Sequence, residues 1–124
     1  MTNRSLCAGT VESGNLIVTV LVEQLREAKV AYDLRDEVVA LIEQTQATNV
    51  VLDLASARFV GSVGFLAFLG VRRHLGNGRI ILCNLSDPIR EMFAVCRLIQ
   101  TENNLTAPFE VAASKDAALA RLSG

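Results

Sequence analysis

The sequence has no tryptophan, one histidine, two prolines and three cysteines among its 124 residues. The cysteines, Cys7, Cys83 and Cys96, form no CxxC pair, which predicts neither a disulfide framework nor a zinc site. We expect all three to be buried thiols of a reducing compartment. The fold must then rest on its core, and a chain of this length can bury roughly two-thirds of the surface of its unfolded form.

The sequence also lacks an excess of charge of either sign. Twelve basic and thirteen acidic residues leave a net charge of −1, and no basic tract suited to nucleic acid is present. The apolar run at 16–22 is too short to cross a membrane, which takes about 20 residues, and it lacks the flanks of a signal peptide. We therefore expect a cytoplasmic protein whose partner is neither nucleic acid nor a membrane.

Constellations for catalysis are missing as well. The sequence contains no phosphate-binding glycine loop, no GxSxG nucleophile elbow and no HExxH metal motif. His74 lies near the end of a predicted helix, where its cation suits the negative end of the helix dipole. We expect no enzyme, and hence no catalytic residue, no cofactor and no metal ligand.

The residues that are present favour alternating strands and helices. Hydrophobic residues make up 51% of the chain, and β-branched runs are typical of a sheet covered on both faces. The strand pattern recurs at 6–11, 16–22, 49–54, 79–83 and 109–111. Helices are predicted from about residue 30, over 62–75, from Ser86 or Asp87 to about 96, and from near residue 114.

The order of these elements predicts the architecture. Residues 12–15, "ESGN", form a hairpin turn, so the first two strands should be antiparallel. The strand, helix, strand repeats that follow imply right-handed parallel crossovers. We therefore predict a single domain over 1–124, of α/β class, with a mixed, mostly parallel sheet, an antiparallel edge strand and about four helices.

One stretch stands apart, "RFVGSVGFLAFLGV" at 58–71, because it places one hydroxyl between two glycines at the start of a helix. The preceding loop leaves the C-terminal end of a strand, where α/β proteins meet their ligands. Two interpretations of Ser62 stay open. It either caps the helix by accepting from the N–H of Gly64 or Phe65, or it is a place for a phosphate, which a helix N-terminus favours.

The helix that Ser62 begins carries a stripe of small residues, Gly64, Ala67 and Gly70. The stripe serves either close packing on the chain's own sheet or the close approach of a partner. Exposure of Phe65 or Phe68, which flank the stripe, would favour the partner.

Two segments carry a family resemblance, "VVLDLASARFVGSVGFLAFL" at 50–69 and "ILCNLSDPIREMFAVCRLIQ" at 81–100. With the order of elements, they resemble the STAS domain of bacterial anti-sigma factor antagonists over nearly the whole chain. That family has Asp-Ser-[Ser/Thr]-Gly-Leu at the start of the helix, and an anti-sigma factor that is also a serine kinase phosphorylates the first serine. Ser62 and Gly64 match the serine and the glycine, whereas Gly61 replaces the acid and Val63 the second hydroxyl residue.

The resemblance implies a function. The unphosphorylated protein would bind an anti-sigma factor or a related protein of the serine-kinase fold, and phosphorylation of Ser62 would end the binding. Glu27 is a loose positional match to a carboxylate that the family uses for its partner, and it could equally be a solvated acid in a helix's first turn. The implied partner-binding residues are Gly61, Val63, Gly64, Phe65 and Glu27, around the phosphoacceptor Ser62.

Alternatives remain. The degenerate motif also suits a STAS scaffold that is never phosphorylated and that self-associates within a signalling complex, and small-ligand binding at the strand ends is a third reading. Asp53 and Arg58 either take part in docking or complete the hydrogen bonds of their loop, and we favour the loop.

Overall fold

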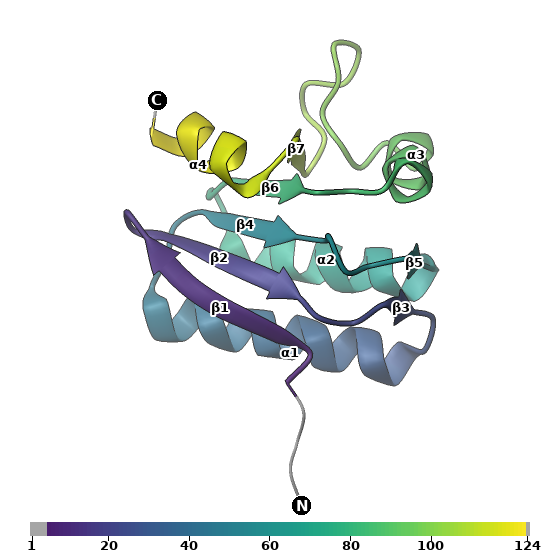
Figure 1. Ribbon diagram of the computed structural model, residues 1–124, viewed down its shortest axis with the longest axis horizontal. Helices are drawn as coiled ribbons and strands as arrows, with labels where there is room; N and C mark the ends of the chain where they lie inside the picture. The colour runs from purple at the N-terminus through teal and green to yellow at the C-terminus, as the bar shows by residue number, and fades with distance from the viewer. Residues whose placement is uncertain (1–4, 124) are drawn as a thin grey trace, which may run out of the picture.

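The central sheet has five strands in the order β1-β2-β4-β6-β7 (Figure 1). The computed structural model describes residues 5–123. Only β1 and β2 are antiparallel, and every other neighbouring pair is parallel, which confirms the predicted mixed sheet. The strands are β1 Cys7–Glu12, β2 Asn15–Val20, β4 Val50–Asp53, β6 Ile80–Cys83 and β7 Glu110–Ala112.

Four helices follow the strands as predicted, with ends shifted by at most a few residues. They are α1 Ala28–Thr45, α2 Ser62–Leu75, α3 Asp87–Val95 and α4 Lys115–Ser123. The end of α2 falls at Gly76, which has a positive φ of 71°, and the exposed His74 lies in the last turn as expected. None of the helices between residues 5 and 123 is long and apolar enough to cross a membrane.

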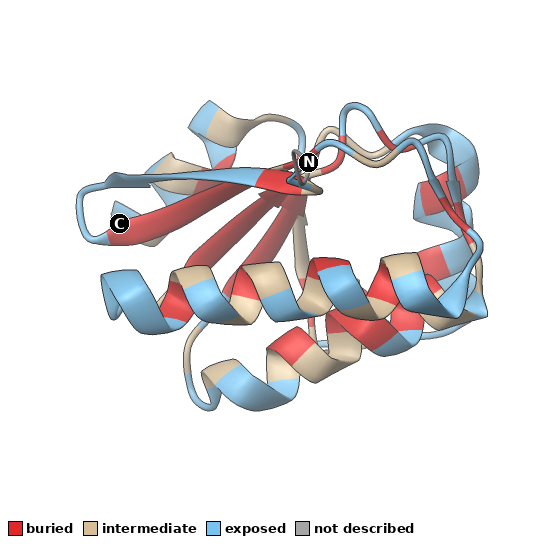
Figure 2. Ribbon diagram, turned by 90° about the horizontal axis from the view of Figure 1, so that it is seen from below, coloured by how far each residue is buried: buried red, intermediate tan, exposed pale blue. Residues whose placement is uncertain are grey.

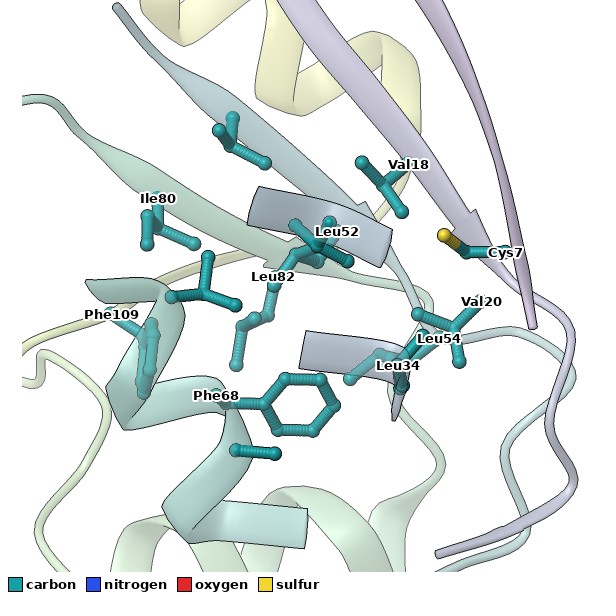
Figure 3. Packing of buried hydrophobic residues seen from close by; sticks show 14 of the residues in the cluster. Cys7, Val18, Val20, Leu34, Leu52, Leu54, Phe68, Ile80, Leu82 and Phe109 are labelled. Atoms are coloured by element: carbon teal, nitrogen blue, oxygen red, sulfur yellow. The ribbon is translucent and has the colours of Figure 1, made fainter. Parts of the chain in front are cut away.

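The core divides between the two faces of the sheet because neighbouring side chains of a strand point to opposite sides. On one face, residues such as Val18, Leu52 and Leu82 pack against α1, α2 and α3, as Figure 3 shows for part of the cluster. On the other face, the alternate residues Ile17, Val51, Ile81 and Cys83 pack against α4. The central strands are therefore buried on both faces, which explains their nearly unbroken apolar sequences.

A second, two-stranded sheet was not predicted. It pairs β3, Gln24–Leu25, with β5, Phe59–Val60, in parallel. The predicted strand over 16–22 was therefore too long, because β2 ends at Val20 and the chain then turns toward β3. Strands of two residues carry no periodic pattern that a sequence could reveal.

The prediction that Ser62 caps α2 is wrong. Gly61 occupies the N-cap, and its carbonyl accepts the N–H groups of Gly64 at 2.9 Å and Phe65 at 3.2 Å. Ser62 is the first residue inside the helix, and no side chain caps α2. Ser86 shows the contrast, since its hydroxyl accepts from the N–H of Ile89 at 3.4 Å and caps α3.

This difference predicts unequal costs for two serine substitutions. Ser62→Ala should change the free energy of unfolding by a few tenths of a kcal/mol at most, because alanine suits a helix interior and no cap is lost. Ser86→Ala should destabilise by about 1 kcal/mol through loss of its cap. Urea unfolding of both variants checks this, and equal losses would contradict the placement of Gly61 as the cap of α2.

The cysteines do not share one environment. Burial and, to a smaller extent, the Glu37 carboxylate raise the pKa of the Cys7 thiol to about 12. Burial, followed by the charge of Asp53, likewise raises the pKa of Cys83 to about 12. Cys96 departs from the prediction, because it follows the last residue of α3 and is exposed.

Alkylation should therefore be selective. Thiolate is the reactive form, so at pH 8 iodoacetamide should modify Cys96 in the folded protein and leave Cys7 and Cys83 unmodified. All three should react in guanidinium chloride. Peptide mass mapping reads the result, and fast labelling of Cys7 without denaturant would contradict its burial.

Candidate partner-binding surface

The small β3–β5 sheet sets the position of Ser62. Leu25 lies opposite Val60 in parallel register, and the Gly61 N–H donates to the Leu25 carbonyl at 3.0 Å. Glu27 and Ser62 each follow the paired residues Leu25 and Val60 by two positions. Because the two strands are parallel, both residues lie just beyond the same end of the small sheet. Helices α1 and α2 thus begin at the same end of the molecule, beside β3 and β5 (Figure 1).

The surface around Ser62 combines its hydroxyl with apolar side chains. Ser62 is exposed, and Leu66, four residues on and so on the same side of α2, is 55% exposed. Phe59, just before the helix, is 42% exposed. We call this region the Ser62 surface; its members are Glu27, Phe59, Gly61, Ser62, Val63 and Leu66.

Contacts hold Phe59 in place on this surface. A Cβ atom on Gly61 would lie 3.3 Å from Cε2 of Phe59, so the ring lies directly beside the glycine backbone. The Arg26 guanidinium carbon lies 4.7 Å from the ring centroid on its face, in a cation–π arrangement. The ring therefore contacts both the Gly61 backbone and the Arg26 guanidinium, while part of it faces solvent.

Glu27 occupies the N-cap of α1, one residue before the helix, and its side chain makes no cap hydrogen bond. It is exposed. Glu27 thus precedes the first turn of α1, whereas one of the two interpretations from the sequence placed it within a first helical turn. Its carboxylate faces solvent and adds a negative charge to the Ser62 surface.

Gly64 and Phe65 lie inside the molecule, so neither offers its side to a partner in this structure. A Cβ atom on Gly64 would meet Cγ1 of Val60 at 2.7 Å and Cβ of Leu25 at 3.1 Å. Phe65 is 7% exposed, and its ring packs edge-to-face on Phe93 with centroids 4.8 Å apart. Gly64 thus seats α2 on the small sheet, and Phe65 packs α2 against α3, so both residues support the Ser62 surface from beneath.

The rest of the small-residue stripe packs within the chain as well. A Cβ atom on Gly70 would lie 2.7 Å from Cδ of Arg35, a residue of α1, and Phe68 is 2% exposed. Of the two interpretations of the stripe, close internal packing is therefore the one that the buried phenylalanines favour.

Asp53 and Arg58 complete the neighbouring loop. One oxygen of Asp53 accepts from the Ala55 N–H and from the side-chain amide of Asn84, each at 3.0 Å. Nε of Arg58 lies 3.3 Å from Oε1 of Glu23 in an ion pair, and both side chains are largely exposed. The loop interpretation is thus the one that these bonds favour. Within residues 5–123 no three side chains of the metal-ligating kinds come together.

Sequence reasoning missed Phe59, Leu66 and Arg26. Leu66 could have been found, because it stands one helical turn beyond Ser62 and breaks the pattern of buried positions. Phe59 and Arg26 carried no such signal. They come together because β3 pairs with β5, and this pairing sets Gln24 opposite Phe59, a residue 35 positions later in the chain.

Comparison with known proteins adds the family. No curated protein gives a significant match. Among solved structures, the chain is similar to the anti-sigma factor antagonist SpoIIAA in its unphosphorylated form, with a TM-score of 0.67, 22% identity, and coverage of 95% of this chain and 98% of that one. The chain is also similar to the Bacillus cell fate determinant SpoIIAA in its phosphorylated form, with a TM-score of 0.65, 23% identity, and coverage of 94% of this chain and 98% of that one.

An anti-sigma-factor antagonist (STAS) domain protein from Planctomyces limnophilus gives a TM-score of 0.72 at 17% identity, with coverage of 94% of this chain and 96% of that one. At such identities the likeness shows a shared fold. The family model for the STAS domain matches residues 12–110, most of the chain, and the protein therefore belongs to the STAS domain family.

Proposed function

We propose that this STAS domain is an anti-sigma factor antagonist that binds an anti-sigma factor, or a related protein of the serine-kinase fold, through the Ser62 surface. The observation that carries the proposal is the exposed position of Ser62 in the first turn of α2, between the exposed Phe59 and Leu66. The proposed role of the domain is binding rather than catalysis. Glu27, Gly61 and Val63 complete the contact surface, with Gly64 and Phe65 beneath it.

The position of Ser62 suits a phosphoacceptor in two respects. Its hydroxyl is accessible to a kinase, and it caps no helix, so a modification there removes no hydrogen bond that holds the fold. A phosphate at this residue would also lie near the free N–H groups of the first turn of α2. The modified domain can therefore remain folded.

The sign of the switch follows from the apolar neighbours. A phosphate adds about two negative charges. In a contact with a partner those charges must lose water beside Phe59 and Leu66, and the nearby Glu27 adds like-charge repulsion. We infer that phosphorylation of Ser62 ends the binding without refolding the domain.

Two similar structures support this proposal. They are of SpoIIAA, an anti-sigma factor antagonist, in an unphosphorylated and a phosphorylated form. In this chain Gly61 stands where the family pattern has an acid and Val63 where it has a hydroxyl residue, so a kinase for Ser62 must recognise a less polar segment.

Affinity purification from the source cells tests the proposal with four baits. Wild type and Ser62→Ala should retain the same kinase-fold protein, whereas Ser62→Asp should lose at least about tenfold in affinity, or about 1.4 kcal/mol. Ser13→Asp is the matched control, because Ser13 is exposed in the β1–β2 turn, at the opposite end of the strands from Ser62, and it should bind like wild type.

Incubation of the captured partner with wild type, Mg²⁺ and ATP should then add the mass of one phosphate to the peptide that contains Ser62. Equal capture by Ser62→Asp and wild type would overturn the switch.

The second candidate function is a scaffold that is never phosphorylated. Gly61 and Val63, which lack the acid and the hydroxyl of the family pattern, favour it. In the same experiment a scaffold would show equal capture by all four baits, with further copies of this chain or common assembly partners retained by each.

A further inference from the structure

Strand β1 forms one edge of the central sheet, and no strand within residues 5–123 pairs with its outer side. Every residue from Ala8 to Glu12 is exposed, and only Cys7 is buried. Figure 2 shows β1 in pale blue beside strands that are mostly red. Helix α4 packs on β4, β6 and β7, and its Lys115 side chain reaches the end of β1, where its ammonium lies 3.4 Å from the Glu12 carboxylate.

The register identifies the backbone groups that face outward. The Leu21 N–H donates to the Leu6 carbonyl at 2.9 Å, and the pairing continues without a break from Cys7 opposite Val20 to Glu12 opposite Asn15. In an antiparallel pair, residues that exchange bonds alternate with residues that do not. Ala8 and Thr10 therefore bond to β2, whereas Cys7, Gly9 and Val11 direct their N–H and carbonyl groups away from the sheet.

This edge lacks the features that usually prevent strands from pairing. Residues 7–11, "CAGTV", contain no charge and no proline, and the continuous register contains no bulge. The charged residue of β1, Glu12, stands at the end of the strand, where the Lys115 ammonium lies 3.4 Å from its carboxylate. At the opposite edge, β7 has three residues, and its Glu110 is held by Arg79 in two hydrogen bonds of 2.7 Å. The unprotected edge is thus β1.

Apolar side chains border the open edge on the side of α1. Val11 is 51% exposed. Leu41 of α1 lies over Gly9, with its Cδ1 atom 2.9 Å from where a Cβ of Gly9 would stand. The missing side chain of Gly9 thus leaves room for Leu41, which packs directly on the strand.

We propose that β1 pairs antiparallel with β1 of a second copy of this chain, with Gly9 facing Gly9 across a two-fold axis. In this register Cys7 faces Val11 of the other copy, and each facing pair exchanges both of its backbone bonds. The uncharged segment meets itself without like-charge repulsion. The two Leu41 side chains, each over its own Gly9, lie near the axis together with Val11.

The same apolar contact distinguishes a second copy from an arbitrary extended peptide, because the symmetric register places Leu41 and Val11 of both copies at one seam. The proposal does not rest on the role of Ser62, since β1 contributes no residue to the Ser62 surface. It would produce a two-fold dimer with a continuous sheet of both copies.

Sedimentation equilibrium from micromolar to millimolar protein, together with amide hydrogen exchange by NMR, tests the pairing. We expect a reversible dimer in which the amides of Cys7, Gly9 and Val11 become protected as the concentration rises. The amides of Ala8 and Thr10 should be protected at every concentration, because β2 already bonds them.

Val11→Lys should raise the dissociation constant of the dimer about tenfold or more, because it places a charge at the seam. Leu105→Lys is the matched control, since Leu105 is 74% exposed in the loop between α3 and β7, and it should dimerise like wild type. A monomer at all concentrations would overturn the proposal. Self-association that leaves the three amides unprotected, or that Leu105→Lys abolishes and Val11→Lys does not, would also overturn it.

Discussion

Burial of the central strands on both faces is the constraint on which the rest of this structure depends. Strands β2, β4 and β6 are almost wholly buried, as expected where helices cover both faces of a mostly parallel sheet. Three helices cover one face and α4 covers the other. The parallel order of β2, β4, β6 and β7 follows from the helices that cross between successive strands.

The same constraint explains the position of the Ser62 surface. Each crossover helix must begin beyond the C-terminal end of the preceding strand, so the loop after β4 leads directly to the start of α2. The small β3–β5 pair then ties this loop to the segment before α1 through the bond from Gly61 to Leu25. An exposed serine is thereby held on a rigid support, with Gly64 and Phe65 packed beneath it.

An open sheet also has edge strands, which are less buried than the strands at its centre. Here it ends at β1, which is held by its hairpin to β2 and by the Glu37 carboxylate, which accepts the Leu6 N–H at 2.9 Å. The hairpin turn has positive φ angles at Ser13 and Gly14, which match the twist of its strands and leave the register unbroken. The Ser62 surface and the outer side of β1 thus lie on separate parts of one fold.

The sequence by itself determined the class of the fold, the four helices and most strand positions. Apolar periodicity, the "ESGN" turn and the glycine after α2 are local signals, and local signals specify elements. It also indicated Ser62 as the residue of interest. Only the tertiary structure decided that Gly61 rather than Ser62 caps α2, that Phe65 is buried and that Cys96 is exposed. It alone brought Phe59 and Arg26 to the serine, because the pairing of β3 with β5 joins two-residue strands that are distant in the chain and too short to leave a pattern.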